Sequence, residues 1–192
     1  SCGFTIGGIA AFSEMENTSL ILIASLMVCG FAAIRYLDLI TTLVAVFSLA
    51  GFIFYQCFET GGIVEQLIPF FFMIVFTIMW FLVKRYRKKD ELNCWHYNFL
   101  TLEAISLLLI YASGNYLVVR ELSVQLMGLD IPEGTDIPFA FIFYFFTVAI
   151  PVVYWWVGIK NKDRVLLWVS LVALACSVFT FKYYYSLGHT EI

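Results

Sequence analysis

The chain has 192 residues, of which 62% are hydrophobic and only 13% are charged, and its formal net charge is −3. A soluble domain has about 45–50% apolar and about 25% charged residues, so a water-soluble fold of this length would leave much apolar surface exposed. The composition excludes a soluble globular domain, favours a helical bundle with the lipid bilayer as its solvent, and gives no indication of a nucleic-acid partner.

Six apolar segments approach or reach the length of a membrane-spanning helix, which is about 20 residues. In chain order they are Ser19–Ile34, Asp38–Phe58, Leu67–Val83, Tyr97–Val118, Pro138–Ile159 and Val165–Phe181. A shorter run, Gly3–Phe12, is expected to be either a truncated seventh span or a re-entrant piece. The sequence therefore predicts an all-α polytopic transmembrane bundle of six to seven spanning helices, in one domain over residues 1–192.

Basic and acidic residues alternate between successive connections. All but two of the eleven Lys and Arg residues fall in three connections, namely Arg35, then Lys84, Arg85, Arg87, Lys88 and Lys89, then Lys160, Lys162 and Arg164. If each segment crosses once, these connections share one side, as the positive-inside rule requires. We expect a bacterial inner-membrane protein with loops 35–37, 84–96 and 160–164 in the cytoplasm and loops 13–18, 59–66 and 119–137 outside.

Glu103 is the one acidic residue well inside a predicted span, about 9 Å from the start of helix 97–118. A carboxylate at that depth costs several kcal/mol unless it is paired, protonated or hydrated. Helical spacing places it in line with His96, Ile110, Gly114 and Glu121, a polar seam suited to a bundle interior. The functional interpretation is a proton or cation relay or a substrate contact. The structural interpretation, which we favour, is a hydrogen bond to a neighbouring helix or an ion pair with the basic loop.

Three further polar residues, Asn115, Arg120 and Glu121, follow at the predicted outer end of the same helix. Arg120 breaks the positive-inside sorting, and either an ion pair with the 119–137 loop or an anion-binding site would account for it. Together with Glu103, these residues form the candidate transport site. The basic run of Lys84, Arg85, Arg87, Lys88 and Lys89 is a candidate contact for anionic lipid headgroups, each charge contributing about 1 kcal/mol near such a surface.

The sequence contains no recognised catalytic, metal-binding or cofactor-binding motif, and its five cysteines form no CxxC pair. We therefore expect no cofactor and no metal. The leading interpretation is a non-enzymatic accessory or scaffold subunit whose partners are the lipid bilayer and other membrane subunits. The alternatives are a small-solute or ion transporter that uses the polar seam of helix 97–118 and, less favoured, an intramembrane enzyme.

Four stretches resemble a group of uncharacterised bacterial polytopic inner-membrane proteins. They are Gly114-Asn-Tyr-Leu-Val-Val-Arg-Glu-Leu122, Asp136-Ile-Pro138, Gly158-Ile-Lys-Asn-Lys-Asp-Arg164 and Phe179-Thr-Phe-Lys-Tyr-Tyr-Tyr-Ser186. The resemblance implies that the chain is part of a longer protein with a further hydrophobic helix after Ile192. It implies no established activity.

Overall fold

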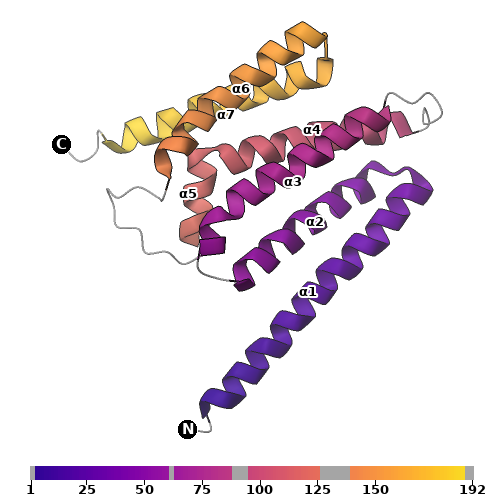
Figure 1. Cartoon of the computed structure of the whole chain (residues 1–192), viewed down its shortest axis with the longest axis vertical. Helices are drawn as coiled ribbons and strands as arrows, with labels where there is room; N and C mark the ends of the chain where they lie inside the picture. The colour runs from indigo at the N-terminus through magenta and orange to yellow at the C-terminus, as the bar shows by residue number, and fades with distance from the viewer. Residues whose placement is uncertain (1–2, 61–62, 88–94, 126–138, 189–192) are drawn as a thin grey trace.

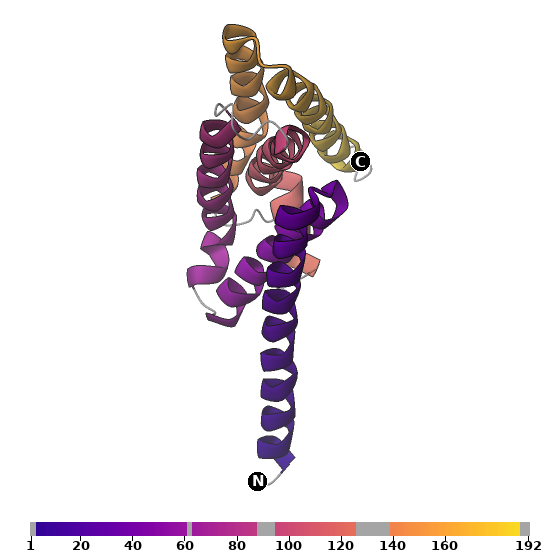
Figure 2. The ribbon, with the colours of Figure 1, turned by 90° about the vertical axis from the view of Figure 1, so that its right-hand side faces the viewer.

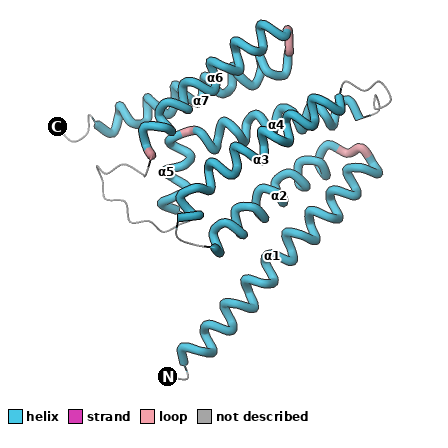
Figure 3. Tube along the Cα trace, viewed as in Figure 1, coloured by secondary structure: helices cyan, strands magenta, loops and turns pink. Residues whose placement is uncertain are grey.

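The computed structural model describes residues 3–60, 63–87, 95–125 and 139–188, with side chains over 18–58, 67–87, 95–123 and 139–183. Every regular element in these ranges is a helix, which confirms the all-α fold (Figure 1, Figure 3). Six of these helices are long and apolar enough to cross a membrane. The helices are α1 (Gly3–Tyr36), α2 (Leu39–Thr60), α3 (Ile63–Arg87), α4 (His96–Gly114), α5 (Tyr116–Gln125), α6 (Ala140–Asn161) and α7 (Arg164–Gly188).

The N-terminal region differs from the prediction because α1 is one continuous helix of 34 residues. The predictions of a separate short segment at 3–12 and of an external loop at 13–18 were therefore wrong. The polar stretch 13–18 contains no proline, so its backbone continues the helix without losing a hydrogen bond. The first reversal comes at Leu37, which has a positive φ of 56°. Asp38 follows and accepts a 3.0 Å hydrogen bond from the Thr41 amide at the start of α2.

Three antiparallel helix pairs, α1 with α2, α3 with α4 and α6 with α7, make up most of the bundle. The C-terminal end of the first helix and the N-terminal end of the second lie together in each pair, and all three pairs have these ends on the right of Figure 1. Figure 2 shows that the N-terminal part of α1 extends beyond the other helices at the opposite end. The shared end carries Arg35, Lys84, Arg85, Arg87 and Lys160, so the sorting of basic residues to one side holds in the folded chain.

The basic connections are shorter than predicted, because α3 continues to Arg87 and α6 continues to Asn161. Lys84, Arg85 and Arg87 therefore occupy the last helical turn of α3 and not a loop. Cations at a helix C-terminus interact favourably with the partial negative charge of its free carbonyl groups. Lys88 and Lys89 lie outside the described residues.

The predicted helix 97–118 is interrupted, since α4 ends at Gly114 and α5 begins at Tyr116. Asn115 between them has an extended backbone, with φ −80° and ψ 123°. Figure 1 shows α5 turning sharply away from the axis of α4. The polar seam that we expected to run through to Glu121 therefore ends at Gly114.

Helix α4 is the centre of the bundle and packs against α2, α3, α5, α6 and α7. Of the six spans, that of α4 has the largest buried share, 39%, whereas only 6% of the α1 span is buried. Its apolar contacts include Ile110 with Phe76 of α3, and Leu107 with Leu166 of α7. Two of the buried polar residues of this region, Glu103 and Asn115, lie toward opposite ends of this central helix.

Candidate functional site

Glu103 is completely buried and is paired with the end of α3. The Arg87 guanidinium group donates a hydrogen bond to one carboxylate oxygen, and the Lys84 ammonium group lies 3.9 Å from the other. Lys84 and Arg87 are three residues apart in a helix, so both side chains leave the same face of α3. The geometry thus agrees with the structural interpretation, in which Glu103 is paired with basic residues at the end of α3.

A second carboxylate, Asp163, reaches the same two cations from the turn between α6 and α7. Its oxygen Oδ2 lies 3.2 Å from the Lys84 ammonium nitrogen and 3.6 Å from the Arg87 guanidinium group. We call Lys84, Arg87, Glu103 and Asp163 the charge cluster. It joins the consecutive helices α3 and α4 to the α6–α7 turn, which is far from both in sequence.

The local fold of the turn fixes the position of Asp163. Lys162 has a left-handed backbone with φ 52°, and its amide donates to the Ile159 carbonyl group, while the Asp163 amide donates to that of Gly158. This pattern is the Schellman motif that commonly ends helices. The other oxygen of Asp163 accepts a 3.2 Å hydrogen bond from the Val165 amide and so caps α7. One carboxylate therefore both starts a helix and joins the charge cluster.

The charge cluster contains two cations and two anions, so its net formal charge is zero. Burial would raise the pKa of Asp163, but the hydrogen bond and charge of Lys84 and the charge of Arg87 outweigh it and hold that pKa below its ordinary value. The Lys84 ammonium group also lies 4.9 Å from the centre of the Trp80 ring, a cation–π contact. Sequence reasoning missed Asp163 and Trp80. The available signal was an acidic residue inside an otherwise basic connection.

Asn115 forms a separate polar junction at the other end of α4, where its amide side chain serves three helices. Its nitrogen donates to the hydroxyl groups of Tyr111 at 2.7 Å and Thr180 of α7 at 3.1 Å. Its oxygen accepts from the Leu117 amide at 3.0 Å and the Val118 amide at 3.5 Å, so it caps α5. Asn115 is 2% exposed, so this amide directs its hydrogen bonds inward.

Thr147 of α6 completes the helix break on its other side. Its hydroxyl oxygen accepts a 3.0 Å hydrogen bond from the Tyr116 amide and donates to the Phe143 carbonyl group at 2.7 Å. The Tyr116 amide stands at the first turn of α5, where a helix cannot supply a partner of its own. The Tyr116 amide therefore has a hydrogen-bond partner although the helix is interrupted beside it.

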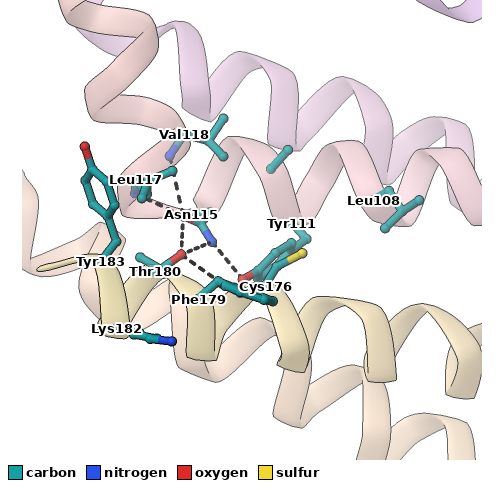
Figure 4. A pocket seen from close by; sticks show the side chains of 11 residues that line it. Leu108, Tyr111, Asn115, Leu117, Val118, Cys176, Phe179, Thr180, Lys182 and Tyr183 are labelled. Atoms are coloured by element: carbon teal, nitrogen blue, oxygen red, sulfur yellow. Dashed lines mark hydrogen bonds between the residues drawn. The ribbon is translucent and has the colours of Figure 1, made fainter. Parts of the chain in front are cut away.

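A pocket of about 720 Å³ opens beside this junction, between α4, α5 and α7 (Figure 4). Its wall is largely apolar and includes Leu108, Ala112, Val118 and Phe179, with Lys182 toward the end of α7. The pocket exists because α5 departs from the axis of α4 at Asn115, which leaves space beside α7.

The four predicted transport-site residues do not form one site. Glu103 and Asn115 are twelve residues apart in or next to α4, which corresponds to about 18 Å along a helix. Arg120 and Glu121 are half-buried on α5 and do not line the pocket. Of the basic run proposed to contact lipid, Lys84 and Arg87 belong to the charge cluster and Arg85 is exposed. Anionic lipid contact by this run stays a prediction.

Comparisons of the chain with protein-family models, with curated proteins and with solved structures gave no match. The architecture is that of a multi-pass integral membrane protein, and the apolar side chains on the outer faces of its helices fit contact with a lipid bilayer.

Proposed function

We propose that the chain is a non-enzymatic accessory or scaffold subunit of a membrane assembly, in a bacterial inner membrane with its basic end in the cytoplasm. The observation that supports this function best is the charge cluster. Its one carboxylate within a membrane span, Glu103, connects α4 to α3, and Asp163 extends the same connection to the α6–α7 turn. The charge cluster therefore holds helices of the bundle together.

A proton or cation relay requires a carboxylate that exchanges partners during transport. Glu103 is fully buried and contacts two cations at once, and those cations are themselves held by Asp163. Separating a buried ion pair costs about 3–5 kcal/mol when one partner is left behind. The cluster therefore favours a static role for Glu103.

The position of α1 supports a role in assembly. It packs mainly against α2, and its apolar side chains are largely exposed, including Met27 and Phe31 at 69% each. This leaves most of the helix surface available for contact with lipid and with a helix of another subunit.

Site-specific photo-crosslinking in native membranes tests the scaffold role. A photoreactive residue in place of Phe31 on α1 is expected to give a discrete crosslink to one protein. The same residue in place of Phe145, an exposed position on α6, serves as the matched control because it is also an exposed phenylalanine but belongs to a different helix. Labelling of lipid alone at both positions, together with migration of the extracted protein as a monomer, would contradict the proposal.

Flux measurements in proteoliposomes test the transporter alternative. The purified chain is expected to give the same proton and potassium flux as empty vesicles. A flux that the wild-type chain supports and Glu103→Gln abolishes, with the variant still folded, would show that Glu103 is a relay and would overturn the scaffold role.

A further inference from the structure

We propose that the pocket between α4, α5 and α7 binds one anionic phospholipid, with its acyl chain in the pocket and its phosphate group at Lys182. This inference does not depend on the scaffold role. It follows from the lining of the pocket, the state of its polar atoms and the location of its one charged side chain.

The size and lining of the pocket fit a hydrocarbon chain. Small-molecule pockets have volumes of about 300–1,000 Å³, and the volume here is about 720 Å³. Leu108 and Ala112 of α4, Val118 of α5 and Phe179 of α7 contribute apolar surface to its wall. Phe179 is 70% exposed, so the pocket lies at the lipid-facing surface of the bundle.

The polar atoms of the Asn115 junction are already bound within the protein. The Asn115 nitrogen donates to Tyr111 and Thr180, and its oxygen accepts from the Leu117 and Val118 amides. The Thr180 hydroxyl group also contacts the Cys176 carbonyl group at 3.0 Å. A polar solute would have to replace these bonds, whereas an acyl chain leaves them intact. Figure 4 shows the hydrogen bonds that link Asn115 to Tyr111 and Thr180 as dashed lines.

Charge selects the headgroup. The eleven residues that line the pocket include one cation, Lys182, and no carboxylate. Lys182 is exposed near the end of the α7 span, where a long basic side chain extends toward the headgroup region. The neighbouring Tyr183 is also of a type that favours this level of a membrane. An apolar pocket with a cation at its polar end matches an anionic phospholipid.

Native mass spectrometry of the full chain in nonionic detergent tests this site, with phosphatidylglycerol and phosphatidylcholine as the two probes. The wild-type chain is expected to retain one phosphatidylglycerol molecule more tightly than phosphatidylcholine. Ala112→Phe fills the pocket and is expected to weaken phosphatidylglycerol binding by about tenfold, because several methylene groups lose their burial. Ala175→Phe, on an exposed part of α7 outside the pocket, is the matched control and should bind as the wild type does.

Lys182→Gln tests the headgroup contact without filling the pocket, and it remains informative if Ala112→Phe fails to fold. We expect it to weaken phosphatidylglycerol binding by about fivefold and to leave phosphatidylcholine binding unchanged. Lys160→Gln, at the opposite end of the bundle, is the control. Equal binding of phosphatidylglycerol by wild type and Lys182→Gln would overturn the proposal. So would displacement of the bound lipid by inorganic phosphate, since that would exclude an acyl-chain contribution.

Discussion

Arg87 and Glu103 form an ion pair that joins the last turn of α3 to the buried face of α4, with the Glu103 side chain wholly excluded from solvent. The two residues are separated by the connection between these helices, and Lys84 and Asp163 complete the charges around them. Because both cations contact both carboxylates, removal of a single member leaves each remaining charge with an opposite one but leaves the cluster with one uncompensated charge.

We expect Glu103→Gln to lower the free energy of unfolding by about 2–3 kcal/mol, below the usual cost of a broken buried pair because Asp163 remains near Arg87. Denaturant titration in mixed micelles measures this change. Arg87→Gln should have a similar effect, and the double variant should lose less than the sum of the two. Additive losses would show that the two side chains are not energetically coupled.

Stability should fall at acidic pH because Asp163 loses its charge. The pKa of Asp163 is lowered in the folded chain, so its contribution is fully present above the ordinary value of 3.8 and is lost as the pH falls through the lower folded value. Thermal unfolding measured from pH 6 downward should therefore show a decline that begins near pH 4. Asp163→Asn should be less stable at pH 6 and should show a shallower acid decline. An identical decline in both proteins would assign the effect to other groups.

Asn115→Ala should destabilise the chain by about 2–3 kcal/mol, because it removes the cap of α5 and leaves Tyr111 and Thr180 without their shared partner. Asn115→Asp keeps the capping oxygen but loses the donating nitrogen, so an intermediate loss is expected. Asn161→Ala, at an exposed helix end, is the matched control and should change stability little. Unfolding in micelles, followed by far-ultraviolet circular dichroism, distinguishes these outcomes.

Two glycines should respond in opposite ways to the same substitution. A Cβ atom at Gly114 would lie 2.6 Å from Ile150 Cδ1 and 3.3 Å from Phe146 Cβ, whereas one at Gly30 would meet nothing within 4 Å. Gly114→Ala should therefore cost about 1–3 kcal/mol through overpacking of α4 against α6. Gly30→Ala should be neutral or slightly stabilising, since alanine favours a helix. Equal thermal stabilities of the two variants would contradict the close approach of α4 and α6.

Most of the candidate site lay beyond sequence reasoning for reasons that particular residues make clear. Helical spacing placed Glu103 in a bundle interior and suggested basic partners, and both features are present in the structure. The same spacing predicted a helix that continues through Asn115, because the helix propensities of the residues near Asn115 do not outweigh the apolar residues on both sides. The break is stabilised by Thr147 and Thr180, which are 32 and 65 residues away in sequence.

The sequence by itself determined that this chain is an all-α membrane bundle and that its basic connections share one end. Hydrocarbon length and the sorting of charge act on each segment separately, so they can be read along the chain. Only the tertiary structure decided that Glu103 and Asn115 belong to different sites, that Asp163 joins the charge cluster, and that a pocket opens where α5 leaves the axis of α4. These features depend on contacts between distant helices, and the energy of such contacts is set by three-dimensional packing.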